Sequence, residues 1–352
     1  MKIGIVTFPE AVNYGTALQA AALKRALDPY AEDVFFLRHR CAAIDAANAL
    51  FDLKSAKDPK YVAAHLYNYP TAKARQKHFE RFFAQYIPVR DAAPDDADVI
   101  VAGSDQIWNY NLTGDDCFYF LDYPKNHSRK TAYAASFGLS EIDGKYHEDL
   151  RRQLSDFDAL SVREQTAAAL IRDICGQDVP VVVDPTLLLT KEQWEELAAP
   201  RKTDGEYIFV YTVFNSERLW RFAADLSKKT GLPVKTVSYS RLHRHAAEYS
   251  FTAGPAEWLR YLLDARCVVT NSFHGFAFSL NFQKEFFFEL PPESSGVGSR
   301  LADLARRYGL TGRELTNADM DEKPDFTESS RLLEEDRKQS TEFIEQNIIQ
   351  LP

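Results

Sequence analysis

One candidate for binding a small anion is Arg163, which follows a predicted strand at 159–162. Its forked guanidinium could hold a carboxylate or a phosphate through two parallel hydrogen bonds. The same arginine could instead form a structural ion pair, for example with Glu164 or Asp184. The residues alone leave both interpretations open.

A second candidate is His274, which lies in the turn Thr270-Asn271-Ser272-Phe273-His274-Gly275. This turn joins a predicted strand at 267–270 to a predicted helix at 275–281. The imidazole titrates near neutral pH and could transfer a proton. Ser272 and Gly275 lie at the helix N-terminus, where free N–H groups favour phosphate, so we expect both to take part in substrate binding. The alternative is a structural histidine that is hydrogen-bonded within the protein.

A third candidate is the stretch Gly103-Ser104-Asp105-Gln106-Ile107-Trp108-Asn109, directly after a predicted buried strand at 99–102. Polar groups at such a place are costly unless they are hydrogen-bonded or functional. Asp105 could accept the proton of a sugar hydroxyl, and Trp108 could stack on a sugar ring. Ser104 and Gln106 are further candidates for substrate binding. A capping turn with a packed aromatic ring is the alternative.

The fourth candidate is formed by Asn13, Tyr14, Gly15 and Thr16, which precede a predicted helix at 17–27. Unpaired N–H groups and the positive end of the helix dipole make such a position suitable for an anion. Gly15 would let the backbone approach a ligand, and Thr16 could cap the helix. An ordinary capped turn is again the alternative.

Several familiar motifs are absent from the sequence. It has no G-x-G-x-x-G, no Walker G-K-[ST], no H-E-x-x-H and no G-x-S-x-G, so we expect neither a metal nor a bound cofactor. The four cysteines are far apart, which is typical of reduced, buried thiols in the cytoplasm. The N-terminus lacks the apolar core of a signal peptide, and no stretch is apolar enough to span a bilayer. We therefore expect a cytoplasmic protein.

Charge is unevenly distributed along the 352 residues. The chain has 42 Lys and Arg against 51 Asp and Glu, a net charge of −9 that disfavours nucleic acid as a partner. Residues 51–90, however, carry eight basic side chains and three acidic ones. Their aromatic residues recur at helical spacing. We predict a helical insertion with a basic face, which is either a solvated surface or a contact surface for an anionic acceptor or the membrane.

Predicted strands and helices alternate in two sets. Residues 1–198 form one set, with the helical insertion at about 45–90, and residues 205–325 form the other. This alternation predicts an α/β protein with two Rossmann-like domains, followed by a helix within 326–352. Because ligands bind beyond the carboxyl ends of parallel strands, we expect the four candidate turns to meet in a cleft between the domains.

The sequence resembles the polysaccharide pyruvyl transferase family. Six stretches carry the resemblance, in order: N-Y-G-T-A-L-Q-A at 13–20 after the opening G-I-V-T-F, V-I-V-A-G-S-D-Q-I-W-N at 99–109, A-Y-A-A-S-F-G at 132–138, L-S-V-R-E at 160–164, D-P-T-L-L-L at 184–189, and V-T-N-S-F-H-G-F-A-F-S-L at 269–280. The resemblance implies a GT-B-like pair of domains with a C-terminal helix that packs back on the first. It also implies transfer of a pyruvyl group from phosphoenolpyruvate to two hydroxyls of a glycan sugar, giving a cyclic ketal, in cell-surface or exopolysaccharide biosynthesis.

The resemblance also implies roles for single residues. Family members bind the donor through an arginine and a histidine that match Arg163 and His274. A further lysine assists in some members; here the choice lies between Lys284 and Arg300, and we favour Arg300. Phe276, where smaller residues often occur, could narrow the pocket. Asp105 is the candidate for positioning or deprotonating the acceptor, which could be a sugar, an oligosaccharide or a lipid-linked glycan.

Two other functions stay open at this point. A glycosyltransferase that uses a nucleotide sugar would need a ribose-binding carboxylate in the second domain. A non-catalytic glycan-binding relative would keep the fold alone, although the presence of both Arg163 and His274 argues against it.

Overall fold

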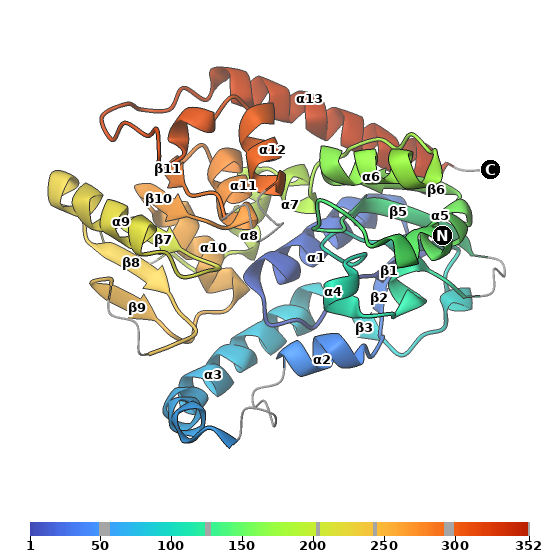
Figure 1. Cartoon of the computed structure of the whole chain (residues 1–352), viewed down its shortest axis with the longest axis horizontal. Coiled ribbons are helices and arrows are strands. Elements are labelled where there is room, and N and C mark those ends of the chain that lie inside the picture. The colour runs from blue at the N-terminus through green and yellow to red at the C-terminus, as the bar shows by residue number, and fades with distance from the viewer. Residues whose placement is uncertain (49–56, 124–127, 202–204, 242–244, 292–298, 351–352) are drawn as a thin grey trace.

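Two parallel β-sheets, each flanked by helices, lie side by side in the molecule (Figure 1). The computed structural model describes residues 1–48, 57–123, 128–201, 205–241, 245–291 and 299–350. Within these ranges the structure confirms the predicted GT-B-like α/β class. The predicted domain boundaries at 198 and 205 stay predictions, and residues 202–204 of the linker lie outside the described ranges.

The first sheet has six strands in the order β3-β2-β1-β4-β5-β6. They are β1 (Lys2–Val6), β2 (Asp33–Leu37), β3 (Val89–Arg90), β4 (Val99–Ala102), β5 (Arg129–Ala135) and β6 (Ala159–Val162). In the centre, Ile3 is paired with Val34 on one side and Val99 on the other. The strands consist largely of buried apolar residues, because helices cover both faces of a parallel sheet.

The second sheet has five strands in the order β11-β10-β7-β8-β9. They are β7 (Ile208–Tyr211), β8 (Val234–Val237), β9 (Glu248–Ser250), β10 (Cys267–Thr270) and β11 (Glu285–Phe288). All neighbouring pairs are parallel, and β10 lies between β7 and β11. The carboxyl end of β10 therefore leads directly into the turn that carries His274.

The helices that frame the candidate turns follow the strands. In the first half they are α1 (Tyr14–Leu27), α4 (Tyr110–Thr113), α5 (His147–Ser155), α6 (Gln165–Cys175), α7 (Pro185–Leu188) and α8 (Lys191–Leu197). In the second half they are α9 (Glu217–Thr230), α10 (Pro255–Asp264), α11 (Phe273–Asn281), α12 (Ser299–Arg307) and α13 (Thr327–Ile344). Each candidate turn lies at or just before the start of one of these helices.

The predicted helical insertion consists of α2 (Ala42–Asn48) and the long helix α3 (Pro59–Tyr86). Residues 49–56, which include part of its basic sequence, lie outside the described ranges. Helix α3 reaches the second half of the chain. Arg75 donates a hydrogen bond to the carbonyl of Phe251 (3.0 Å), and Nδ1 of His78 lies 2.8 Å from Oε1 of Glu257. The insertion thus connects the two halves on the side opposite to α13 (Figure 1).

The C-terminal helix α13 returns across both sheets, as the resemblance implies (Figure 1). Arg337 donates to the side-chain oxygen of Asn281 in α11 (2.6 Å). Ser340 accepts a hydrogen bond from the N–H of Val183 (3.0 Å) and donates to the carbonyl of Asp336 (2.6 Å). Helix α13 therefore holds together the segments that carry the candidate turns.

The sequence-based expectation is wrong in two places. The apolar run at 179–183 predicts a strand that ends before Asp184, but Val181 forms only an isolated bridge with Val162 before the chain turns into α7. Pro180 lacks an N–H and Pro185 begins a helix, so little of the segment can extend the sheet. The cysteines are not all buried either, since Cys117 is exposed.

We predict that Ser340→Ala lowers the free energy of unfolding by about 1–3 kcal/mol, because the buried N–H of Val183 loses its acceptor. Urea denaturation monitored by circular dichroism measures the change. Lys338→Ala, at an exposed position of the same helix, is the control and should alter stability by less than about 0.5 kcal/mol. Equal effects of the two substitutions would contradict this role of Ser340.

Candidate active site

Arg163 lies directly after β6 and is almost completely buried. Its Nη1 donates to Oδ2 of Asp184 (2.7 Å), and its Nε lies 3.4 Å from Oε2 of Glu164. The guanidinium stacks over the ring of Phe273, with 4.7 Å between its carbon and the ring centre. The remaining nitrogen, Nη2, is buried and has no hydrogen-bond partner among the described residues. One arm of the fork is therefore free to bind a ligand.

His274 lies in the first turn of α11, opposite Arg163. Ser272 caps this helix by accepting a hydrogen bond from the N–H of Gly275 (3.3 Å). The Nε2 atom of His274 lies 3.8 Å from Oδ2 of Asp184, too far for a hydrogen bond, and it is buried without a partner within the described ranges. A β-carbon added to Gly15 would lie 2.0 Å from Nδ1. The imidazole is thus packed against the N-terminus of α1, where only glycine fits.

Arg300, the second residue of α12, completes the cluster of cations. Its Nε is buried and has no partner in the part of the chain that the structure describes. Lys284 points elsewhere and donates to the carbonyls of Leu263 and Ala265 at the end of α10. The structure therefore places Arg300, and not Lys284, beside Arg163.

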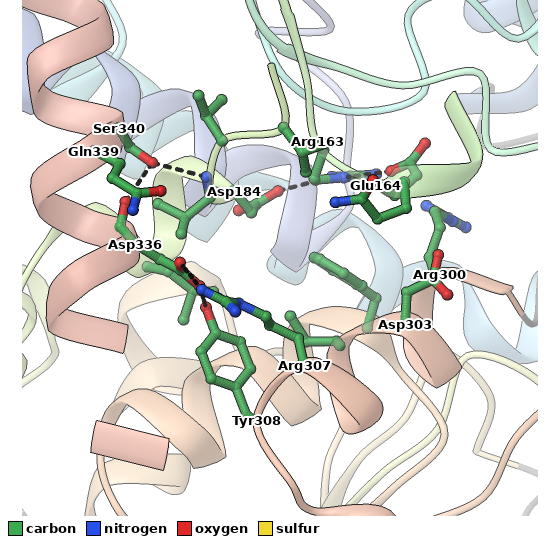
Figure 2. A pocket seen from close by; sticks show the side chains of 17 residues that line it. Arg163, Glu164, Asp184, Arg300, Asp303, Arg307, Tyr308, Asp336, Gln339 and Ser340 are labelled. Atoms are coloured by element: carbon green, nitrogen blue, oxygen red, sulfur yellow. Dashed lines mark hydrogen bonds and ion pairs between the residues drawn. The ribbon is translucent and has the colours of Figure 1, made fainter. Parts of the chain in front are cut away.

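A cavity of about 310 Å³ lies between α6, α12 and α13 (Figure 2). Arg163 and Arg300 contribute to its walls. Arg307, which also lines it, is paired with Asp336 of α13 (2.9 Å), and Tyr308 donates to the same carboxylate (2.9 Å). Of these three arginines, Arg163 and Arg300 have a buried nitrogen without a hydrogen-bond partner among the described residues.

Asp184 joins the elements of the site. Its Oδ1 accepts hydrogen bonds from the N–H (2.9 Å) and the hydroxyl (2.7 Å) of Thr186, while Oδ2 accepts from Arg163 and Ser104 (3.3 Å). Burial alone would raise the pKa of this carboxyl group, but Arg163 and His274 outweigh it and hold the pKa below its usual value. Asp184 is therefore ionised, and its charge offsets part of the positive charge beside it.

The pKa values of the cations show how strongly the site is desolvated. Burial lowers the pKa of His274, Asp184 opposes this change, and Arg163 adds to it. Burial and repulsion by Arg163 also lower the pKa of Arg300. Burial also tends to lower the pKa of Arg163, but attraction by the carboxylates of Asp184 and Glu164 outweighs it, so this pKa is raised. An anion bound between Arg163 and Arg300 would consequently reduce the repulsion between these two side chains.

Asp105 lies in the loop after β4, close enough to interact electrostatically with Arg163, His274 and Arg300. Its φ angle of 82° is unusual for a residue other than glycine and indicates backbone strain. Oδ2 accepts a hydrogen bond from Thr16 (2.5 Å), and Oδ1 accepts one from the N–H of Gln106 (2.8 Å). The α1 and β4 turns thus meet at Asp105, as expected from the topology.

Some predicted site residues have structural positions instead. Trp108 is fully buried and donates to the carbonyl of Tyr119 (3.0 Å), so it cannot stack on a sugar. Tyr14 is in the core and donates to the carbonyl of Ala253 (2.9 Å). Phe276 packs between two phenylalanine rings of β11 and does not narrow the site.

Three polar residues of the same turns support their neighbours. Asn13 caps α1 by accepting a hydrogen bond from the N–H of Thr16 (3.2 Å). Gln106 accepts one from Asn109 (3.0 Å), and Ser104 donates to Asp184. Direct contact between these side chains and a substrate stays a prediction.

The sequence suggested Asp184 only as an ion-pair partner of Arg163. It did not indicate that the ring of Phe273 packs against the guanidinium of Arg163. The signal for Asp184 was its place before Pro185, at the end of an apolar segment. No group of three or more His, Cys, Asp or Glu side chains within the described ranges is arranged to hold a metal ion.

The sequence matches the polysaccharide pyruvyl transferase family over residues 13–288, which include all four candidate turns. The chain belongs to this family. A search of curated proteins finds no significant match to the sequence.

Solved structures offer distant similarities. The chain is similar to the UDP-GlcNAc 2-epimerase of Methanocaldococcus jannaschii, with 13% identity, a TM-score of 0.46, and 95% of this chain and 99% of that one covered. It is also similar to the E. coli heptosyltransferase WaaC in complex with ADP-2-deoxy-2-fluoro heptose, with 14% identity, a TM-score of 0.40, and 83% and 89% covered. Neither similarity bears on the substrate of this polysaccharide pyruvyl transferase family member.

We predict that Gly15→Ala destabilises the protein by about 1–3 kcal/mol, because the methyl group would overlap the imidazole of His274. Urea denaturation measures the loss. Gly144→Ala, where no atom lies within 4 Å of the added carbon, should change stability far less. Similar values for the two variants would show that α1 and His274 are not in close contact.

We predict that Asp184→Asn lowers the pKa of His274 further, because the neutral amide no longer stabilises the imidazolium. NMR titration of the imidazole measures this pKa. The variant should also lose about 3–5 kcal/mol of stability, since Arg163 stays buried without its carboxylate.

The control for Asp184→Asn is Asp178→Asn, which breaks the exposed pair with Arg172 and should have little effect on either quantity. An unchanged or higher pKa of His274 in Asp184→Asn would refute the electrostatic role of Asp184.

Proposed function

We propose that this transferase moves the pyruvyl group of phosphoenolpyruvate onto two hydroxyls of a glycan sugar and forms a cyclic ketal. The observation that carries the proposal is the presence of three buried nitrogens without partners among the described residues: Nη2 of Arg163, Nε2 of His274 and Nε of Arg300. A buried donor without an acceptor is costly, and a small polyanion would satisfy several at once.

The nearby carboxylates do not cancel this preference for an anion. Asp105 and Asp184 direct their oxygens to donors of the protein, and Oε1 of Glu164 accepts a hydrogen bond from Ser136 (2.6 Å). The carboxylates are therefore satisfied within the protein, whereas the cations retain unused donors. This asymmetry favours phosphoenolpyruvate, a small molecule that carries a carboxylate and a phosphate on the same carbon atom, C2.

In the proposed reaction Arg163 and Arg300 bind the carboxylate and phosphate, and the imidazolium of His274 protonates C3 of the enol. C2 then becomes electrophilic, and a sugar hydroxyl adds to it and loses its proton. Inorganic phosphate then departs from C2, and the second hydroxyl attacks C2 and closes the ketal. The proton of one hydroxyl restores the imidazolium of His274, and the proton of the other goes to the departing phosphate. Asp105 is the proposed group for positioning the acceptor or taking up its proton.

The acceptor is proposed to be a sugar, an oligosaccharide or a lipid-linked glycan of a cell-surface or exopolysaccharide pathway, with the reaction in the cytoplasm. It would enter the cleft between the carboxyl ends of the two sheets, on the side of Asp105 and the first turn of α1.

One observation favours a nucleotide sugar as an alternative substrate. Glu289, directly after β11, is buried and its Oε2 has no hydrogen-bond partner within the described ranges. Such a carboxylate could accept hydrogen bonds from two ribose hydroxyls. Thermal denaturation with UDP-GlcNAc tests this alternative. A ligand at about 100 times its dissociation constant adds about 2.7 kcal/mol to the free energy of unfolding.

We predict that phosphoenolpyruvate binding takes up protons near pH 7. Burial keeps the His274 pKa low in the free protein, and a bound anion would raise it, so the imidazole becomes protonated on binding. Affinity should therefore weaken as the pH rises through the pKa of the complex. Calorimetry in buffers with different ionisation enthalpies measures the proton uptake.

His274→Gln should bind the donor more weakly and lose the histidine's share of proton uptake, while His147→Gln, in α5, should behave like the wild type. Arg163→Lys keeps the charge but loses the fork, and should weaken binding by roughly tenfold or more. Wild-type affinity in both site variants would refute the proposed donor site.

A further inference from the structure

The outer surface of α3 has an unusual composition for a helix of a dissolved protein. Leu66, Tyr67 and Tyr69 are 66%, 43% and 40% exposed, and they account for three of the seven large hydrophobic residues found exposed in the described ranges. They lie next to one another in the N-terminal half of α3. Scattered exposed apolar residues are normal, but a cluster of them indicates a contact surface.

Basic residues continue the same surface. Leu66, Lys73, Lys77 and Arg81 are all exposed and follow one another at intervals of seven, four and four residues, which places them along one side of the helix. The exposed Glu80 lies on the same side, so the three basic residues there outnumber one acidic residue. The opposite side contains the buried residue Phe79, among others. We call the set Leu66, Tyr67, Tyr69, Lys73, Lys77 and Arg81 the α3 face. It belongs to the segment 51–90, which is basic in a chain with a net charge of −9.

The α3 face lies beside the loop that follows β8. Arg241, in the loop after β8, lies 4.3 Å over the ring of Tyr67. Arg75, from the inner side of α3, lies 4.2 Å over the ring of Tyr239 in the same loop, and Tyr239 is 44% exposed. Val213, 58% exposed, follows β7 at the neighbouring strand end. Figure 1 shows α3 along one edge of the molecule, with its N-terminal end extending beyond the two sheets.

We propose that the α3 face docks the protein on an anionic lipid surface. Tyrosine and leucine side chains favour the interface between water and lipid, and the lysines and arginine are attracted to anionic headgroups. Charge disfavours a symmetric dimer through this surface, because the two copies would bring the same positive face together. No described helix is long and apolar enough to cross a membrane, so the contact is peripheral.

Docking through this face would bring the loops at the carboxyl ends of β7 and β8, where parallel sheets bind ligands, close to molecules held in the lipid surface. This consequence rests on the proposed function, because it identifies the acceptor as a lipid-linked glycan. Lipid binding itself needs neither donor nor acceptor, so it can be tested separately.

The test is co-sedimentation of the full chain with vesicles of phosphatidylcholine containing about 30 mol % phosphatidylglycerol, compared with vesicles of pure phosphatidylcholine. We expect binding to the anionic vesicles, little binding to the neutral ones, and release at about 0.5 M NaCl. Lys73→Glu/Lys77→Glu should reduce the partition coefficient by more than tenfold, since each removed basic side chain alone accounts for about fivefold.

Leu66→Glu should also reduce binding. Leu112→Glu, at a leucine of α4 that is 40% exposed, is the matched control and should bind like the wild type. Thermal melting confirms that the variants are folded. The proposal is wrong if the wild type does not sediment with anionic vesicles, if the α3 variants bind as well as the control, or if sedimentation velocity shows that the face forms a dimer instead. Vesicle binding without any binding of phosphoenolpyruvate would overturn the donor site and leave this surface assigned.

Discussion

The buried ion pair between Arg163 and Asp184 is the interaction on which the site depends. Both side chains are almost fully removed from water, and they come from different segments of the first half of the chain. Removing an arginine from water costs several kcal/mol, which a carboxylate at 2.7 Å can offset. Because Asp184 satisfies only one arm of the guanidinium, the other arm stays available. The pair thus stabilises a charged guanidinium that is shielded from water, and it leaves Nη2 of Arg163 available to a ligand.

The rest of the structure brings further groups to this pair. Thr186 and Ser104 fix the carboxylate, so the strand ends of the first sheet determine where Arg163 points. The second half of the chain supplies Phe273, His274 and Arg300 from the starts of α11 and α12. These groups lie on separate segments, and α13 connects the segments through hydrogen bonds to Val183 and Asn281. The geometry of the anion site therefore depends on how the two halves pack together.

Much of this arrangement could be predicted from the sequence. The apolar runs predicted the strands at 99–102, 159–162 and 267–270 with the bounds that the structure has, because parallel strands buried on both faces are continuously hydrophobic. Arg163, His274 and Asp105 were identified because each follows such a strand. The role of Asp184 could not be recognised, since the strand expected before it is only a single bridge at Val181.

The direction in which a side chain points could not be predicted from the sequence. Trp108 follows a strand end as Asp105 does, yet it packs inward against Phe120. The sequence likewise did not predict α12 as a helix, and so the position of Arg300 on its first turn was a preference without a geometric reason. Contacts between distant segments, such as that of Gly15 with His274, become visible only when both halves are folded.

The central claim is that Arg163, His274 and Arg300 form one binding site for phosphoenolpyruvate. Crystallography of the protein with phosphoenolpyruvate tests it most directly. The account predicts electron density for the donor between these three side chains, with its carboxylate or phosphate within hydrogen-bond distance of Nη2 of Arg163 and Nε2 of His274. An empty site at saturating donor, or a donor bound away from Arg163, would contradict it.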